Sequence, residues 1–213
     1  MSQCSDILER VAQTGCITGR WNMSNSESRL GQRFLIDTHI LDGTDDATCR
    51  LWELHNDGWI QLCRSDAMDT ELLERADEAH RTLLLERSAE LVEVRGVGVV
   101  GHSRLDHMVL GSDQEAADWD DLWQVMWPGA DRASTSRRTQ TRIRDAMHVW
   151  TAARYAYSAF ITWDGSGSRP GVLTRADAIQ DRFGLWVATP DDVVAFLDRL
   201  KRRYELRHRG SPH

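Results

Sequence analysis

Four carboxylates stand at positions where a parallel α/β protein gathers its ligands. Asp37 follows the apolar strand 34–36, and Asp164 follows the apolar strand 160–163. Glu71 and Asp145 each lie near the predicted start of a long helix. Carboxylate oxygens are hard ligands that Mg²⁺ or Mn²⁺ prefers, with phosphate and water oxygens completing the coordination. The four acids therefore predict a Mg²⁺ or Mn²⁺ site suited to chemistry on phosphate esters.

The predicted elements alternate between strands and helices. Apolar runs indicate strands at 33–37, 59–64, 92–102, 159–163 and 185–188. Amphipathic spacing indicates helices at 5–14, 47–55, 69–91, 113–127, 141–157 and 175–183, and one from Pro190 onward. Such alternation favours an α/β fold of three layers, α/β/α, with a central parallel sheet. Ligands of such sheets collect at the carboxyl ends of the strands, which would bring Asp37 and Asp164 to one edge.

The chain of 213 residues with 41% hydrophobic content suits one domain. We predict an N-terminal extension at 1–32, a main domain at 33–200 with a helical insertion at about 92–140, and a basic tail at 201–213. No apolar run approaches the ~20 residues of a membrane span, and residues 1–15 contain acids and no apolar block. A cytoplasmic protein without a membrane partner is expected. The scattered cysteines form no Cys-x-x-Cys pair, which argues against a zinc knuckle or a redox motif.

Basic residues are concentrated locally although the net charge is −7, which disfavours indiscriminate binding to nucleic acid. Arg137, Arg138 and Arg142 come just before Asp145 and are predicted to hold substrate phosphates. A solvated basic face is the alternative interpretation of this run.

Tryptophans recur every four residues at Trp119, Trp123 and Trp127. Such a stripe is typical of packing, here against the N-terminal extension, and part of it could form a dimer or partner interface.

Two blocks of the sequence resemble the PIN domain family of metal-dependent nucleases, which includes the VapC-type toxins of bacterial toxin–antitoxin pairs. Residues 34–38 (FLIDT) are similar to the family's first strand and first acid. Residues 144–148 (RDAMH) and 160–164 (FITWD) are similar to its helix with the third acid and to the strand that ends in Thr-x-Asp. Residues 187–192 are similar to its closing strand and helix start.

This resemblance implies a ribonuclease that hydrolyses RNA with one or two Mg²⁺ or Mn²⁺ ions. Asp37, Asp145 and Asp164 would be ligands, Glu71 would bind or orient an ion, and Thr162 would position water or Asp164. An antitoxin protein and a homodimer would be partners.

Some assignments stay open at this level. Asp66, Asp69 and Glu74 compete with Glu71 for the place of the second acid. His148, three residues after Asp145 on a similar helix face, is interpreted as a packed or hydrogen-bonded residue and not as a catalyst, and His39 is ambiguous. The alternative function is a PIN-like scaffold that binds RNA or a protein without cutting.

Overall fold

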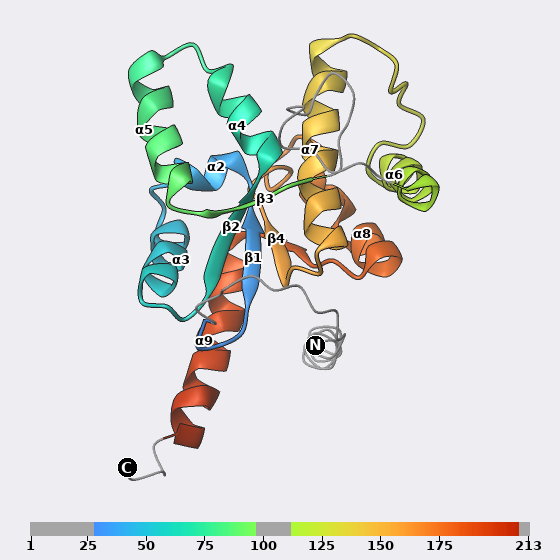
Figure 1. The fold of residues 1–213 in the computed structure, drawn as a ribbon. Helices are drawn as coiled ribbons and strands as arrows, with labels where there is room; N and C mark the ends of the chain where they lie inside the picture. The colour runs from blue at the N-terminus through green and yellow to red at the C-terminus, as the bar shows by residue number, and fades with distance from the viewer. Residues whose placement is uncertain (1–27, 97–111, 209–213) are drawn as a thin grey trace.

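A five-stranded, all-parallel sheet forms the centre of the protein, with helices on both faces (Figure 1). The computed structural model describes residues 28–96 and 112–208. The strand order is β3-β2-β1-β4-β5. In sequence order the strands are β1 (Arg33–Ile36), β2 (Gln61–Ser65), β3 (Val92–Val94), β4 (Ala159–Ile161) and β5 (Val187–Ala188). In the central register Leu35 lies between Cys63 and Phe160.

Helices connect these strands. They are α2 (Thr38–Leu41), α3 (Asp46–Asn56), α4 (Asp66–Leu73), α5 (Glu78–Ala89), α6 (Asp113–Met126), α7 (Arg137–Arg154), α8 (Ala176–Phe183) and α9 (Pro190–His208), with a 3-10 turn at Val172–Arg175. Four helices are preceded by a residue whose side chain accepts a hydrogen bond from a backbone N–H of that helix. These residues are Asp45 for α3, Asp77 for α5, Ser112 for α6 and Ser136 for α7. Because these caps satisfy N–H groups that lack partners inside a helix, they fix where each helix begins.

Alternate residues of each strand enter two separate cores. Phe34 and Ile36 pack on the face covered by α2, α3, α4, α5 and α9, whereas Leu35 packs on the opposite face. The second face is covered by α6, α7 and α8 (Figure 1). Side chains of successive strand residues point to opposite faces of a sheet, so both faces must be apolar when both are covered. The three-layer α/β/α architecture predicted from the sequence is confirmed.

The predicted single helix 69–91 is wrong, because two helices, α4 and α5, occupy this stretch. The break lies at residues 74–77, where the Asp77 side chain accepts the His80 N–H at 3.0 Å and starts α5. Leu73 and Leu83, two of the leucines whose spacing suggested one amphipathic helix, are exposed. Glu71 therefore lies in the second half of α4 and does not open a long helix.

The predicted start of helix 141–157 is also wrong, because α7 begins at Arg137. The Ser136 side chain accepts the Thr139 N–H at 3.2 Å, which starts the helix within a stretch whose polarity suggested a loop. Asp145 therefore lies in the middle of α7, and the positive end of the helix dipole is too distant to stabilise its charge.

The tryptophan stripe belongs to the core of the monomer. Trp123 and Trp127 are buried, and Trp119 is partly buried against the same cluster. They pack with α7 and α8. The predicted packing against the extension 1–32 involves residues that lie mostly outside the described ranges. The predicted helix 5–14 and most of the predicted strand 92–102 lie outside the described residues. Among the described helices, none is long and apolar enough to cross a membrane.

Candidate active site

Asp37 and Asp164 come together where the order of the strands reverses. In the sheet β1 lies between β2 and β4. The chain adds β2 and β3 on one side of β1 and then β4 and β5 on the other side. Crevices form at the carboxyl ends of strands at such a switch point, because the connecting segments leave in opposite directions. Asp37 directly follows β1 and is buried, and Asp164 follows β4 and is partly buried.

Thr162 joins these two acids. Its hydroxyl is fully buried, donates to Asp37 Oδ2 at 2.5 Å and accepts the Asp164 N–H at 2.9 Å. The Asp164 carboxylate also accepts the Val172 N–H at 2.7 Å. A Cβ at Gly171 would overlap this carboxylate, so only glycine leaves it room. Thr162 therefore orients the Asp37 carboxylate and the backbone of Asp164, whereas Val172 and Gly171 set the place of the Asp164 carboxylate.

Helices α4 and α7 bring three further groups to the same place. Glu71 on α4 and Asp145 on α7 are partly buried, and His148, one turn after Asp145, is fully buried. Asp37, Glu71 and His148 each offer a ligand atom within 4.8 Å of one another. The imidazole Nε2 of His148 lies 3.5 Å from Glu71 Oε2 and has no hydrogen bond of normal length. The four predicted acids thus form one cluster, which also includes His148.

Repulsion within the cluster perturbs the pKa of the acids. Burial, together with the negative charges of Asp37, Asp164 and Glu71, raises the pKa of Asp145 well above its usual value, against the opposing effect of His148. The pKa of Asp164 is also raised, by burial and by Asp37, although the Val172 N–H and His39 oppose this shift. A charged carboxylate is costly beside others in a partly dry site. A bound cation would relieve that cost.

The pKa shifts of Glu71 and His148 both favour the charged form of the group, because the two side chains form an ion pair. Burial opposes ionisation of Glu71, but His148, the Thr38 hydroxyl and Arg144 outweigh it and lower the pKa of Glu71 to about 2. Burial also disfavours the imidazolium, yet Glu71, Asp37 and Asp145 raise the pKa of His148 to about 9. The histidine thus supplies positive charge to the cluster in the metal-free protein.

The three rivals for the second acid have other partners. Asp69 pairs with Arg64, and Glu74 forms a two-pronged pair with Arg144. Asp66 accepts the Gly96 N–H at 3.1 Å. Glu71 is the one of the four that the structure brings beside Asp37.

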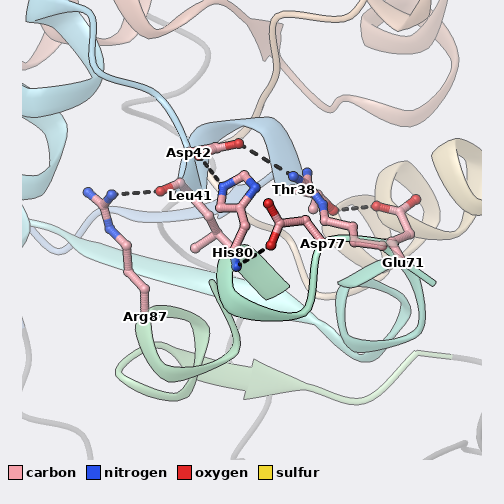
Figure 2. Close-up of polar contacts among 8 residues, drawn as sticks. Thr38, Leu41, Asp42, Glu71, Asp77, His80 and Arg87 are labelled. Carbon is pink, nitrogen blue, oxygen red and sulfur yellow. Dashed lines mark hydrogen bonds and ion pairs between the residues drawn. The ribbon is translucent and has the colours of Figure 1, made fainter. Parts of the chain in front are cut away.

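Polar contacts fix α4 and α5 against α2 (Figure 2). Thr38 donates a hydrogen bond to Glu71. Farther along α2, Asp42 pairs with His80 at 2.9 Å, and Arg87 donates to the Leu41 carbonyl at 2.7 Å. Because α2 follows Asp37 directly, these contacts hold Glu71 in a fixed place relative to the first acid.

A cavity of about 730 Å³ opens beside the cluster. Both Asp145 and Asp164 line it, and so do four arginines: Arg138, Arg142, Arg169 and Arg175. Within residues 28–96 and 112–208, none of the four pairs with a carboxylate. The guanidinium of Arg142 lies over the Trp127 ring, 5.0 Å from its centre. Arg137, the third arginine predicted to hold phosphate, is exposed and does not line the cavity.

Sequence reasoning missed part of this site. Arg169 and Arg175 lie in the segment after β4 and were not singled out, since nothing in their spacing ties them to Asp145. His148 was assigned to packing. The available signal was its spacing from Asp145, because a carboxylate and an imidazole three residues apart share a helix face, an arrangement that helical metal sites use.

No protein-family model matches the chain, and no curated protein shows significant similarity to it. The geometry of the acid cluster and of the arginine-lined cavity therefore carries the functional argument.

Proposed function

We propose that the protein is a ribonuclease of the PIN type that hydrolyses phosphodiester bonds with Mg²⁺ or Mn²⁺. The observation that carries this proposal is the shared cavity: Asp145 and Asp164 line the same hollow as Arg138 and Arg142. Acids bind hard cations, and guanidinium groups bind phosphate through paired hydrogen bonds. A site that combines both chemistries suits a phosphodiester substrate.

The donor set fits a divalent cation. Burial, together with the charges of the neighbouring acids, raises the pKa of Asp145, and among the described residues the buried Nε2 of His148 has no hydrogen-bond partner. Asp37, Glu71, Asp145 and Asp164 would hold the ion or ions. When bound, a divalent cation would lower the pKa of water and neutralise charge on the phosphate.

The protein's own groups supply orientation and binding. The Thr162 hydroxyl donates to the Asp37 carboxylate and accepts the backbone N–H of Asp164, while the Val172 N–H holds the Asp164 carboxylate, so neither carboxylate rotates freely. Arg142 is held by stacking on Trp127, which suits it to receive a phosphate in a defined place. Such preorganised charges lower a reaction barrier, because they need no rearrangement as charge develops.

The choice of RNA, and of an antitoxin and a homodimer as partners, extends this proposal through the resemblance of residues 34–38, 144–148 and 160–164 to PIN-type toxins. The rival function is a scaffold that binds RNA without cutting it. The raised pKa of Asp145 favours the enzyme, since a surface that only bound RNA would gain nothing from crowded carboxylates at its binding cavity.

Cleavage assays with single-stranded and structured RNA test the proposal. The wild type should cut RNA with Mg²⁺ or Mn²⁺ and lose this activity in excess EDTA. Asp164→Asn should cut at least about 100-fold more slowly, as loss of a key electrostatic group does elsewhere. Asp181→Asn, an exposed acid on α8, serves as the matched control and should keep wild-type activity. Cleavage that persists in EDTA would refute the metal mechanism, and RNA binding without cleavage under any metal would favour the scaffold.

A further inference from the structure

Helix α7 presents a nitrogen donor to the acid cluster. His148 is 1% exposed, and its Nε2 lies within 4.8 Å of ligand atoms of both Asp37 and Glu71. This nitrogen has no hydrogen-bond partner of normal length within the described ranges 28–96 and 112–208. Buried polar groups without a hydrogen bond are rare, because the bonds they made to water are not replaced. A metal ion that accepts the Nε2 lone pair would give this nitrogen a partner.

The surroundings of His148 orient its ring for that role. Nδ1 lies 2.6 Å from the Ser65 hydroxyl, at the end of β2. The ring stacks on Phe160 of β4, with planes 14° apart. When Nδ1–H donates to Ser65, the lone pair of Nε2 points to the acid cluster, and the ring cannot turn away. Histidines that bind metals are commonly held in this way, with the second nitrogen bonded to a fixed acceptor.

We infer that His148 is a metal ligand and that the site prefers Mn²⁺ and Co²⁺ to Mg²⁺. The inference rests on the proposed function only in taking Asp37 and Glu71 as ligands of the same ion. Imidazole suits transition metals, whereas Mg²⁺ prefers an all-oxygen shell. Affinity of mixed nitrogen and oxygen sites rises from Mn²⁺ to Co²⁺. An all-carboxylate site would show a weaker preference for Co²⁺ over Mg²⁺.

Calorimetric titration of the metal-free protein with MgCl₂, MnCl₂ and CoCl₂ tests this without any RNA. The wild type should bind Co²⁺ and Mn²⁺ more tightly than Mg²⁺. His148→Gln should weaken Co²⁺ binding by about 100-fold, the upper range for groups around a bound metal, and change Mg²⁺ binding by less than about threefold. Ser65→Ala, which removes only the positioning hydroxyl, should weaken Co²⁺ binding by about 10-fold. The matched control is His208→Gln, which removes an exposed histidine whose Nδ1 lies 2.7 Å from the Tyr204 carbonyl oxygen of the same helix, α9, and should bind all three ions as the wild type does.

A spectroscopic measurement on the wild type tests the assignment of His148 even if His148→Gln does not fold. Spin-echo spectra of the Mn²⁺-loaded protein should show coupling to an imidazole nitrogen. An oxygen-only shell in that spectrum, or unchanged or tighter Co²⁺ binding in His148→Gln, would overturn the assignment. Selective binding of Co²⁺ without RNA cleavage would support this inference and refute the proposed function. RNA cleavage together with equal affinity for Mg²⁺, Mn²⁺ and Co²⁺ would support the proposed function and refute this inference.

Discussion

The buried pair of Glu71 and His148 makes the stability of the metal-free protein depend on pH. His148 has its pKa raised from 6.5 to about 9 in the folded protein. A group whose pKa is higher in the folded state stabilises the fold below its unfolded pKa and loses that contribution as the pH rises through the folded value. At about 1.4 kcal/mol per pKa unit, the difference between 6.5 and about 9 is worth about 3 kcal/mol. We expect the free energy of unfolding to fall by about this amount between pH 6.5 and pH 9.

The pKa of Glu71 is shifted by the same ion pair. Its pKa is lowered from 4.5 to about 2, so the contribution of the pair is present above pH 4.5 and is lost as the pH falls toward 2. The two shifts describe one interaction and are not added. Asp145 acts in the same direction as His148, because its raised pKa makes its ionisation destabilising as the pH rises above its ordinary value.

Urea unfolding in a chelating buffer, at half-unit steps from pH 5 to pH 9.5, measures this effect. His148→Gln should flatten the decline between pH 6.5 and 9, and His208→Gln, which changes an exposed histidine of α9, should keep the wild-type profile. The difference between wild type and His148→Gln isolates the pair from other groups that titrate in this range. A wild-type stability that stays level from pH 6.5 to 9, or a decline equally steep in His148→Gln, would refute the reasoning.

Two further predictions concern the cavity. Replacing Arg138 and Arg142 with Gln, in the Asp164→Asn background that prevents cleavage, should weaken RNA binding. It should also reduce the slope of the log binding constant against log salt concentration by about two in magnitude. Arg137→Gln, a neighbour on the same helix turn that does not line the cavity, should leave that slope unchanged; an equal effect of Arg137 would place the phosphate elsewhere. Gly171→Ala should displace the Asp164 carboxylate and slow RNA cleavage by about 100-fold, the effect of a misplacement of about 1 Å, while Gly167→Ala, whose Cβ would meet open space, should be neutral. Full activity of Gly171→Ala would show that the position of Asp164 is not critical.

The sheet and two of its acids were predictable because their signals are local. Each apolar run that precedes Asp37 and Asp164 is short, buried on both faces and followed directly by polar residues, which is typical of a parallel strand and its carboxyl end. The reversal of strand order between β2 and β4 then brings the two acids together.

The helix boundaries were less predictable because a cap competes with periodicity. The spacing of leucines from Leu72 to Leu84 continues across residues 74–77 as if one helix ran through them. One Asp77 side chain breaks it by accepting the His80 N–H. In the same way, Ser136 starts α7 within a stretch whose polarity suggested a loop. A hydrogen bond of this kind contributes about 1 kcal/mol, enough to move a helix end but too little to appear in a hydrophobic pattern.

The roles of Glu71 and His148 depended on tertiary structure. Whether Glu71 or one of its neighbours approaches Asp37 is decided by the contacts between α2 and the α4–α5 pair, and those contacts involve residues far apart in sequence (Figure 2). His148 could be placed on the same helix face as Asp145 from sequence, but the partners that make it part of the site, Ser65 and Glu71, come from β2 and α4.

The arrangement of charge gives the cation a second task besides chemistry. Asp145 and Asp164 line the cavity that the arginines surround, so a phosphate drawn in by Arg138 and Arg142 meets carboxylates at its far end. Without a cation those carboxylates repel the phosphate, and the net charge of −7 adds repulsion at a distance. In the proposed function, a cation held by the acids would offset much of their negative charge and place a positive charge beside the phosphate, in addition to the arginines. Because binding free energies are linked, RNA that favours the metal-loaded site must tighten metal binding by the same factor. If the proposed function holds, the crowded acids would thus make substrate affinity depend on the presence of the ion.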